Sequence, residues 1–296
     1  MARTVVAPRA GARSSTRRLP TLASPWGPIA YALLGLAGLA TVLPFVWEFV
    51  LATHSTSDIA SASPPLSIGR DLVRNYEALI EYAPYFWRSM LNSAVIALAS
   101  TVVTVFFSAL GGYAFARYDF PLKEKLFWLL LATMMIPGQL GLIPWYLQMT
   151  WMGWTNTFLP FVVPAIGSAF GTFWMRQYIG SAIPPALFDA ARMDGCGEFG
   201  AFWRIALPLA APAAGALAIT TFIGGWNAFL GPLVVMTDPS MYTYAVALAN
   251  LRGVHGTDTG ALLVGSSIAT LPMLLVTIFG SRRLIDGLTA GSLSGQ

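Results

Sequence analysis

The segment FDAARMDG, residues 188–195, has three charged side chains in eight residues, whereas 10% of the whole chain is charged. Asp189 and Arg192 are three residues apart, so on a helix they lie on one face and can form an ion pair across a turn. Asp194 adds a second carboxylate. The chemistry available to this segment is electrostatic contact, either within the protein or with a partner.

Other reactive groups are few and scattered. A single cysteine, Cys196, excludes an intrachain disulfide, and the two histidines, His54 and His255, give no cluster with metal-ligand spacing. The sequence lacks the phosphate-cradling pattern G-x-x-x-x-G-K-[ST] of a nucleotide-binding P-loop. We therefore expect this chain to bind no cofactor.

The elements that position the charged segment are apolar. Hydrophobic residues make up 56% of the 296 residues, against about 45–50% in soluble domains, and the mean hydropathy is +0.64. A membrane-spanning helix needs about 20 apolar residues. Six such segments predict an all-α integral membrane protein: about Ile29–Leu51, Met90–Phe115, Leu126–Leu147, Phe158–Trp174, Ala211–Val235 and Gly260–Gly280.

The basic residues predict the orientation of these spans. With both termini in the cytoplasm, thirteen of the seventeen Lys and Arg residues lie inside and four, Arg70, Arg74, Arg88 and Arg252, lie outside. Lys and Arg collect in cytoplasmic loops, which accounts for the basic balance and argues against nucleic-acid binding. The predicted parts are a basic cytoplasmic tail with the start of the first span (1–28), a region of six transmembrane helices (29–281) and a cytoplasmic C-terminal tail (282–296).

The charged segment falls in an inner loop, Met175 to Leu209, that is long compared with the usual connection of about 4–6 residues. Pro185 can open a helix and Gly195 can close it in the left-handed conformation. On that helix Leu187, Ala190, Ala191 and Met193 are expected on one side. The first half of the loop therefore predicts a short amphipathic helix.

A second helix is expected from Glu198, whose carboxylate suits a helix N-terminus. Its apolar stripe is Phe199, Phe202, Trp203 and Ala206, and Pro208 is expected to end it. The helix–turn–helix could lie on the lipid headgroups, cap its own bundle, or offer a docking surface to a partner. Periodicity does not decide among these three positions.

Residues 189–212, DAARMDGCGEFGAFWRIALPLAAP, resemble the cytoplasmic coupling signature, the EAA motif, of permeases of binding-protein-dependent ABC importers. Asp189 stands in place of the usual Glu, and Cys196 in place of a common Ala. The resemblance implies that ATPase coupling involves the loop 176–208, with Asp189, Ala190, Ala191, Arg192, Asp194, Gly195, Cys196, Ile205, Leu207 and Pro208. Phe199, Phe202 and Trp203 would anchor this loop to the bundle.

The resemblance extends from about Asn92 to Gly295. Over this range the sequence is similar to the carbohydrate branch of these permeases, and within it to the maltose-type second permease subunit. NSAVIALASTVVTVFFSALGGYAFARYDFP, MMIPGQLGLIPWYL, TFIGGWNAFLGPLVV and GLTAGSLSG carry it. It implies a sugar importer of a prokaryotic plasma membrane. Its partners would be a second, different permease subunit, a dimer of ABC ATPases that binds ATP and Mg²⁺, and an extracytoplasmic solute-binding protein.

Stacking aromatics and amides grip sugars, and the spans offer Gln139, Trp145, Tyr146, Trp226 and Asn227 as candidates for the solute path. Each could equally be structural. The sequence does not decide whether the solute is a mono-, di- or oligosaccharide or a polyol phosphate such as glycerol phosphate. A membrane-embedded enzyme needs ionisable groups deep in its spans, and none is found there. A scaffold protein would explain six spans but not the inner loop.

Overall fold

The computed structural model describes residues 27–61, 63, 65–251 and 258–293, with side chains described as far as Gly280. All regular elements of these residues are helices, as the sequence predicted. The chain divides into two units, Met1–Glu48 and Phe49–Gln296. Most of the expected basic tail, 1–26, and the last residues, 294–296, lie outside the described part.

The first unit contains most of α1 (Gly27–Leu51), an apolar helix of 25 residues with Pro44 inside it. Its length is about that of the hydrocarbon core at 1.5 Å per residue. Its bounds agree with the first expected span.

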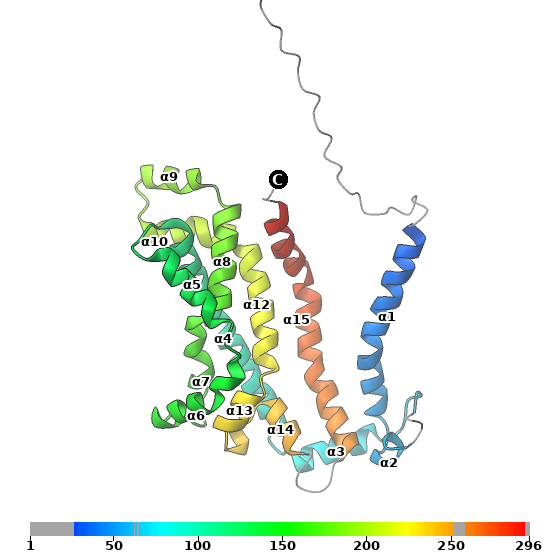
Figure 1. Ribbon diagram of the computed structural model, residues 1–296. Coiled ribbons are helices and arrows are strands. Elements are labelled where there is room, and N and C mark those ends of the chain that lie inside the picture. Colours follow the sequence, from blue (N-terminus) through cyan, green and yellow to red (C-terminus); the bar gives the residue numbers. More distant parts are fainter. Residues whose placement is uncertain (1–26, 62, 64, 252–257, 294–296) are drawn as a thin grey trace, which may run out of the picture. The chain divides into compact units, whose positions relative to one another are not determined.

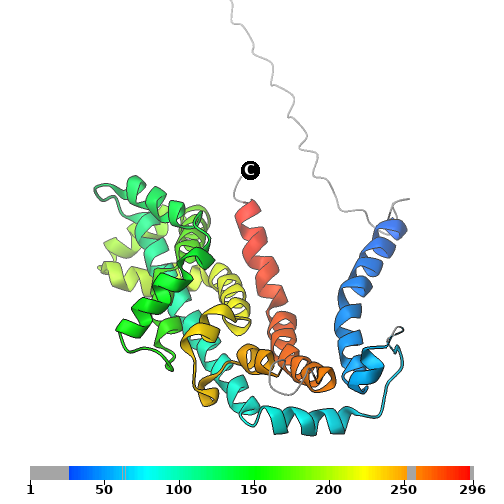
Figure 2. The same cartoon turned by 60° about the horizontal axis from the view of Figure 1, so that its bottom comes forward.

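The second unit is built on α4 (Phe86–Arg117), α8 (Ala169–Ala182), α12 (Ala211–Trp226) and α15 (Thr259–Leu293). Helix α4 packs along both α8 and α12, and α12 packs against α15 (Figures 1 and 2). Small residues recur on the buried face of α4, which lets neighbouring backbones approach closely. They are Ser89, Ser93, Ala97, Ser100, Thr104, Ser108 and Gly112.

Two glycines show how close these helices come. A Cβ atom on Gly112 would lie 2.6 Å from both the backbone nitrogen of Arg176 and Cβ of Met175. A Cβ atom on Gly225 would lie 3.1 Å from Cα of Ala97. The contacts of α4 with α8 and α12 are therefore backbone contacts, and glycine is required at the first of them.

We expect Gly112→Val to destabilise the protein by about 1–3 kcal/mol, because the added atoms overlap the backbone of α8. Gly224→Val is the matched control, since a Cβ atom there meets nothing within 4 Å. Thermal unfolding of the purified protein in detergent measures the difference. Equal melting temperatures for the two variants would contradict the tight contact of α4 with α8.

Six uninterrupted spans are not observed. Among the described residues three helices are long and apolar enough to cross a membrane: Gly27–Leu51, Phe86–Arg117 and Thr259–Gly280. Two bent pairs raise the number to five if each is counted as one span. Helix α8 has 14 residues, and its last turns, to Ala182, occupy what was expected to be the start of the inner loop.

The third expected span is broken. Helix α5 (Lys123–Thr133) and the segment Gly138–Trp151, which contains η1 (Gly138–Gly141) and α6 (Leu142–Trp151), meet at 86°. Pro137 stands at the break, where it removes a backbone donor and cannot continue a helix. The segment before α8 is likewise divided into α7 (Leu159–Val162) and η2 (Pro164–Gly167).

The fifth expected span consists of α12 and α13 (Leu230–Val235), separated at Asn227–Phe229. On its other side α12 follows α10 (Glu198–Ala201), the π-helix η3 (Phe202–Ala206) and α11 (Leu207–Leu209), with a bend of 74°. At the end of the chain α15 continues to Leu293, so the expected C-terminal tail 282–296 is helical as far as Leu293.

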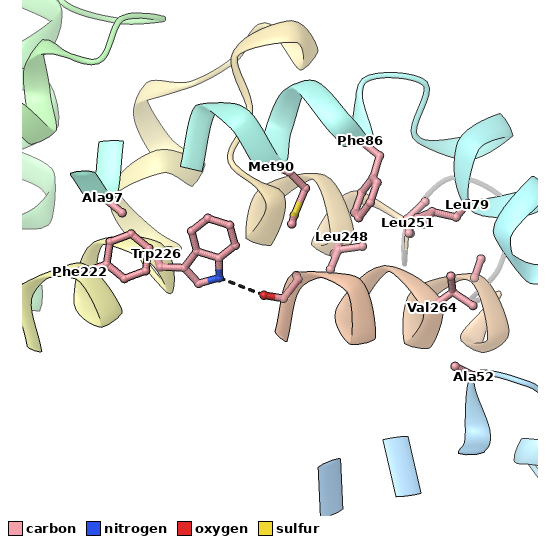
Figure 3. Packing of buried hydrophobic residues seen from close by; sticks show 12 residues of the cluster. Ala52, Leu79, Phe86, Met90, Ala97, Phe222, Trp226, Leu248, Leu251 and Val264 are labelled. Carbon is pink, nitrogen blue, oxygen red and sulfur yellow. Dashed lines mark hydrogen bonds between the residues drawn. The ribbon is translucent and has the colours of Figure 1, made fainter. Parts of the chain in front are cut away.

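The segments expected to be loops on the outer side, 52–88 and 237–259, contain helices that were not predicted: α2 (Thr56–Ile59), α3 (Leu72–Tyr82), η4 (Pro239–Met241) and α14 (Tyr244–Asn250). Helices α3 and α14 contribute Leu79 and Leu248 to a buried apolar cluster that also contains Phe86 and Val264 (Figure 3). Asn75 of α3 is buried and donates to the carbonyls of Ala52 and His54. These long-range contacts fix the outer segments.

Candidate functional site

Helix α9 (Pro185–Met193) is the centre of the expected inner loop. It lies crosswise beyond the end of α8, at the end of the bundle opposite α6, α7 and α13 (Figure 1). Buried Ile183 anchors the connection, and Pro184 is the N-cap residue with Pro185 at the first helical position, as predicted. The loop therefore presents one short helix across the bundle end.

Helix α9 ends in a Schellman motif. Asp194 is the C-cap residue and Gly195 follows with φ +76°. The amide of Gly195 donates to the carbonyl of Arg192 at 3.0 Å, and the amide of Cys196 donates to that of Ala191 at 2.8 Å. The predicted left-handed glycine is confirmed, and it reverses the chain into α10.

Of the four apolar residues expected on one side of α9, Leu187, Ala190 and Met193 do share a side, and Ala191 lies apart from them. Phe188 is buried in the cluster formed with α4 and α8, and Ala191 is half-buried. Leu187, Ala190 and Met193, spaced three apart, face solvent, and Met193 is 88% exposed. The sequence missed this because Phe188 was not recognised as the residue that seats the helix.

The charges of α9 form a small network. Arg192 approaches Asp189 at 3.8 Å, the pair that the spacing predicted, but its shorter contacts are with Glu198. Nε of Arg192 donates to Oε1 of Glu198 at 3.1 Å, and Nη2 forms an ion pair with the same oxygen at 3.1 Å. Asp189 and Asp194 are exposed. Arg192 thus ties α9 to the start of α10.

The last turn of α4 holds both helices of the loop. The hydroxyl of Tyr118 donates to Oε2 of Glu198 at 2.7 Å. Burial, and then the hydrogen bond to Glu198, raise the pKa of the Tyr118 phenol, so it stays protonated and donating at neutral pH. We call Tyr118, Glu198 and Arg192 the clasp.

An aromatic contact seats α9 beside the clasp. The guanidinium carbon of Arg117 lies 4.2 Å from the ring centroid of Phe188, and Nη2 of Arg117 donates to the carbonyl of Pro185 at 3.5 Å. The ring of Tyr113 lies 5.7 Å from that of Phe188 and 5.6 Å from that of Phe202. Helix α4 therefore contacts α9 and η3 together.

The second helix of the loop also departs from its expected form. Phe202 and Ala206 are buried, whereas Phe199 and Trp203 are exposed at the surface. The ring centroids of Trp203 and Phe106 are 5.8 Å apart. Pro208 does not end the element: it lies inside α11, and the bend comes after Leu209. The π-turn ahead of it uses the amide of Leu207, which bonds the carbonyl of Phe202, so proline follows without breaking the turn.

The remaining predicted loop residues border the same cluster. Ile205, Leu207 and Cys196 are half-buried against the buried residues of α4, α8 and α12. Pro208 is exposed. Arg117 and Tyr118 were missed by sequence reasoning, which took Arg117 only as an inner charge, although an Arg-Tyr pair at the end of a span was a visible signal.

We expect Tyr118→Phe to loosen the inner loop, because Glu198 loses its shortest hydrogen bond while the packing stays unchanged. Hydrogen–deuterium exchange of the backbone amides in 185–201 should become severalfold faster. The matched control is Tyr178→Phe, since Tyr178 packs in the same cluster and its hydroxyl makes no hydrogen bond within the described residues. Equal exchange in both variants would mean that the clasp does not hold the loop.

A second candidate region is a cavity of about 450 Å³ in the half of the bundle away from α9 (Figure 1). The side chains of Trp145 of α6 and Phe161 line it. Glycines, which have no side chain, expose their backbone to the cavity. The glycines are Gly138, Gly141 and Gly231. None of the described residues that line the cavity is charged.

The other candidate path residues lie around this cavity or in the core. Gln139 is exposed beside it in η1, and Tyr146 is half-buried in a neighbouring apolar cluster. Asn227, at the end of α12, accepts from the hydroxyl of Tyr244 at 2.8 Å. Of the five candidates, Trp145 alone lines the cavity.

Trp226 is a core residue. Its indole nitrogen donates to the carbonyl of Ala269 at 3.1 Å (Figure 3), and its ring contacts those of Phe222 and Tyr244. It is buried and its donor is already used. The role that its geometry supports is packing of α12 on α15. In the described part of the chain no three His, Cys, Asp or Glu residues lie close enough together to hold a metal ion.

The fold of the chain is similar to that of a chain in a solved ABC transporter. The chain matches, with a TM-score of 0.73 and 20% identity, a chain in the crystal structure of a bacterial ABC transporter involved in the import of the acidic polysaccharide alginate. The match covers 87% of this chain and 95% of that one. The fold is therefore that of an ABC-transporter membrane subunit.

Residues 16–285 match the family model described as binding-protein-dependent transport system inner membrane component, and the chain belongs to this family. It is 36% identical over 221 residues to the arabinooligosaccharides transport system permease protein AraQ of Bacillus subtilis, covering 75% of this chain and 78% of that protein. It is 31% identical over 273 residues to the lactose transport system permease protein LacG of Rhizobium radiobacter, covering 92% and 96%.

A third relative carries a different solute in its name. The chain is 29% identical over 265 residues to the sn-glycerol-3-phosphate transport system permease protein UgpE of Yersinia pestis, covering 87% of this chain and 94% of that protein. Family membership confirms the prediction of a transporter subunit rather than an enzyme. The predicted resemblance to ABC importer permeases is confirmed as well.

Proposed function

We propose that the chain is one of two different permease subunits of a sugar or oligosaccharide importer, and that α9 is its docking helix for an ATPase subunit. The outward face of α9 carries the proposal. Leu187, Ala190 and Met193 form an exposed apolar strip at the bundle end, with the carboxylates of Asp189 and Asp194 beside it. An exposed apolar strip with polar neighbours is typical of a protein contact.

The clasp supports a mechanical role for this helix. Arg192, Glu198 and Tyr118 connect α9 to α10 and to α4, and α4 packs on α8 and α12. When two ATPase subunits close around ATP and Mg²⁺, they would displace α9. Because of these contacts, α4, α8 and α12 would move with it. ATP chemistry belongs to the partner chains, and this chain contributes the lever and half of the pathway.

The broken helices fit six membrane crossings. We assign these to α1, α4, α5 with η1 and α6, α7 with α8, α12 with α13, and α15. The positive-inside rule then places both termini and α9 in the cytoplasm of a prokaryotic cell, with the permease region 29–281 in the plasma membrane. The opposite end would receive solute from an extracytoplasmic binding protein.

The cavity beside Trp145 supports a sugar over a polyol phosphate. An indole ring and backbone amides suit a neutral sugar ring, whereas a phosphate calls for Arg, Lys or a helix N-terminus. The cavity has no cationic lining residue within the described part of the chain. The names of AraQ and LacG agree with a sugar, and that of UgpE keeps glycerol phosphate as the alternative.

The test is reconstitution of this chain with its ATPase, second permease and binding protein in proteoliposomes. Oligosaccharides should stimulate ATP hydrolysis and sn-glycerol 3-phosphate should not. Trp145→Ala should lower sugar uptake about three- to tenfold if the indole stacks on the solute. Trp151→Ala, at an exposed indole outside the cavity, is the control. Stimulation by glycerol phosphate alone would replace the sugar assignment.

A further inference from the structure

A second pocket lies at the end of the bundle that carries α9. It has a volume of about 320 Å³ and is formed where α4 ends, α5 begins and α8 approaches its last turn. Lys123 and Arg176 line it together with Gln177 and Ser181. Two cations from different helices thus face one polar pocket.

Both cations are largely withdrawn from solvent. The side chain of Lys123 is 17% exposed and that of Arg176 is 20% exposed. The guanidinium carbon of Arg176 lies 3.7 Å from the ring centroid of Phe127, which fixes the plane of the group. A guanidinium held in this way is pre-organised to donate to an anion.

The protein's own carboxylates do not fill the pocket. Asp119 and Glu124 each lie 3.2 Å from one of the two cations, yet both are much more exposed than the cations and neither lines the pocket. Exposed ion pairs of this kind contribute little. Lys123 has three donors and Arg176 five, so both retain donors for a further anion.

Two neighbouring features favour a lipid phosphate over a free anion. The pocket lies at the first turn of α5, which no side chain caps, so its backbone donors add positive potential. From there α5 leads away from the α9 end and exposes Leu126, Trp128 and Leu129, an apolar surface suited to acyl chains. Basic pockets between spans at the cytoplasmic side are suited to anionic head groups.

We propose that Lys123 and Arg176 bind the phosphodiester of an anionic phospholipid in the leaflet on the α9 side. The side-chain amide of Gln177 makes no hydrogen bond within the described residues, so it offers a further donor beside them. This site is separate from the proposed docking face of α9 and does not rest on the proposed transport function.

The test uses native mass spectrometry of the delipidated full chain in detergent, titrated with phosphatidylglycerol or with phosphatidylcholine of the same acyl chains. We expect one phosphatidylglycerol to be retained at least tenfold more strongly than phosphatidylcholine. Lys123→Gln and Arg176→Gln should each remove this preference. Lys125→Gln is the matched control, because Lys125 is exposed on the same helix and outside the pocket.

Several outcomes would overturn the proposal. Equal retention of both lipids, or an equal loss in Lys125→Gln, would mean that diffuse charge attracts the lipid. Displacement of phosphatidylglycerol by millimolar inorganic phosphate would mean that the pocket takes free anions. If Arg176→Gln melts at a lower temperature because Phe127 loses its cation, Lys123→Gln alone decides the question.

Discussion

Met193→Glu is expected to reduce association of the ATPase with the permease about five- to 150-fold and to lower transport strongly. Met193 is 88% exposed, so the substitution should not disturb the fold. In the docked state, however, a carboxylate would enter an apolar contact without a partner, at a cost of about 1–3 kcal/mol. Since about 1.4 kcal/mol is a factor of ten in affinity, pull-down of the ATPase at graded concentrations measures the loss.

Leu66→Glu is the matched control for this result. Leu66 is 83% exposed, in the segment between α2 and α3 and far along the chain from the inner loop. The same carboxylate introduced there should leave ATPase association unchanged. If Met193→Glu retains the ATPase as well as Leu66→Glu does, the outward face of α9 is not the docking surface.

Gly195→Val is expected to have the second large effect. Gly195 has φ +76°, where a β-branched residue costs about 1–2 kcal/mol or more, and both hydrogen bonds of the Schellman motif depend on this conformation. The end of α9 should unwind and Met193 should lose its position. We expect severalfold lower transport and faster hydrogen exchange in 190–197, with normal insertion into the membrane.

Gly197→Val separates backbone strain from bulk. Gly197 lies two residues further on with φ −70° and ψ 163°, an extended conformation open to any residue, and a Cβ atom there meets nothing within 4 Å. A Cβ atom on Gly195 also meets open space. The two variants add the same side chain to the same turn, so equal activity in both would show that the left-handed residue is not needed.

The local structure of the inner loop could be predicted from the sequence. Pro185 at the first helical position, Gly195 after the last and Glu198 at the next helix start are local signals, and each was confirmed. Such signals depend on φ and on backbone donors within a few residues of one another. They need no knowledge of the rest of the fold.

The contacts of the loop could not be predicted in the same way. Glu198 receives its shortest hydrogen bond from Tyr118, 80 residues away, and Phe188 packs on Tyr113 of α4. Periodicity predicted that Leu187 and Met193 share a side of the helix, but not that this side faces outward. The burial of Trp226 depends likewise on the distant carbonyl of Ala269.

The number of spans was obscured for a related reason. Hydropathy recognises an apolar segment but not whether its helix is continuous, and Leu126–Leu147 contains an 86° break. Pro137 signals a bend, yet its size depends on neighbouring helices that satisfy the freed backbone groups. Helix α3 was missed although Val73, Tyr76 and Ile80 recur at helical spacing, because its 11 residues are too short and too polar to be recognised as a span.

Cross-linking from α9 tests the docking role most directly. Cys196 is the single cysteine, so Met193→Cys in a Cys196→Ser background carries a thiol-reactive photo-cross-linker at one known position. In the assembled transporter it should cross-link to the ATPase, with a yield that changes when ATP is added, and Leu66→Cys in the same background should not. Cross-linking to lipid alone, or equal ATPase cross-linking from both positions, would contradict a docking role for α9.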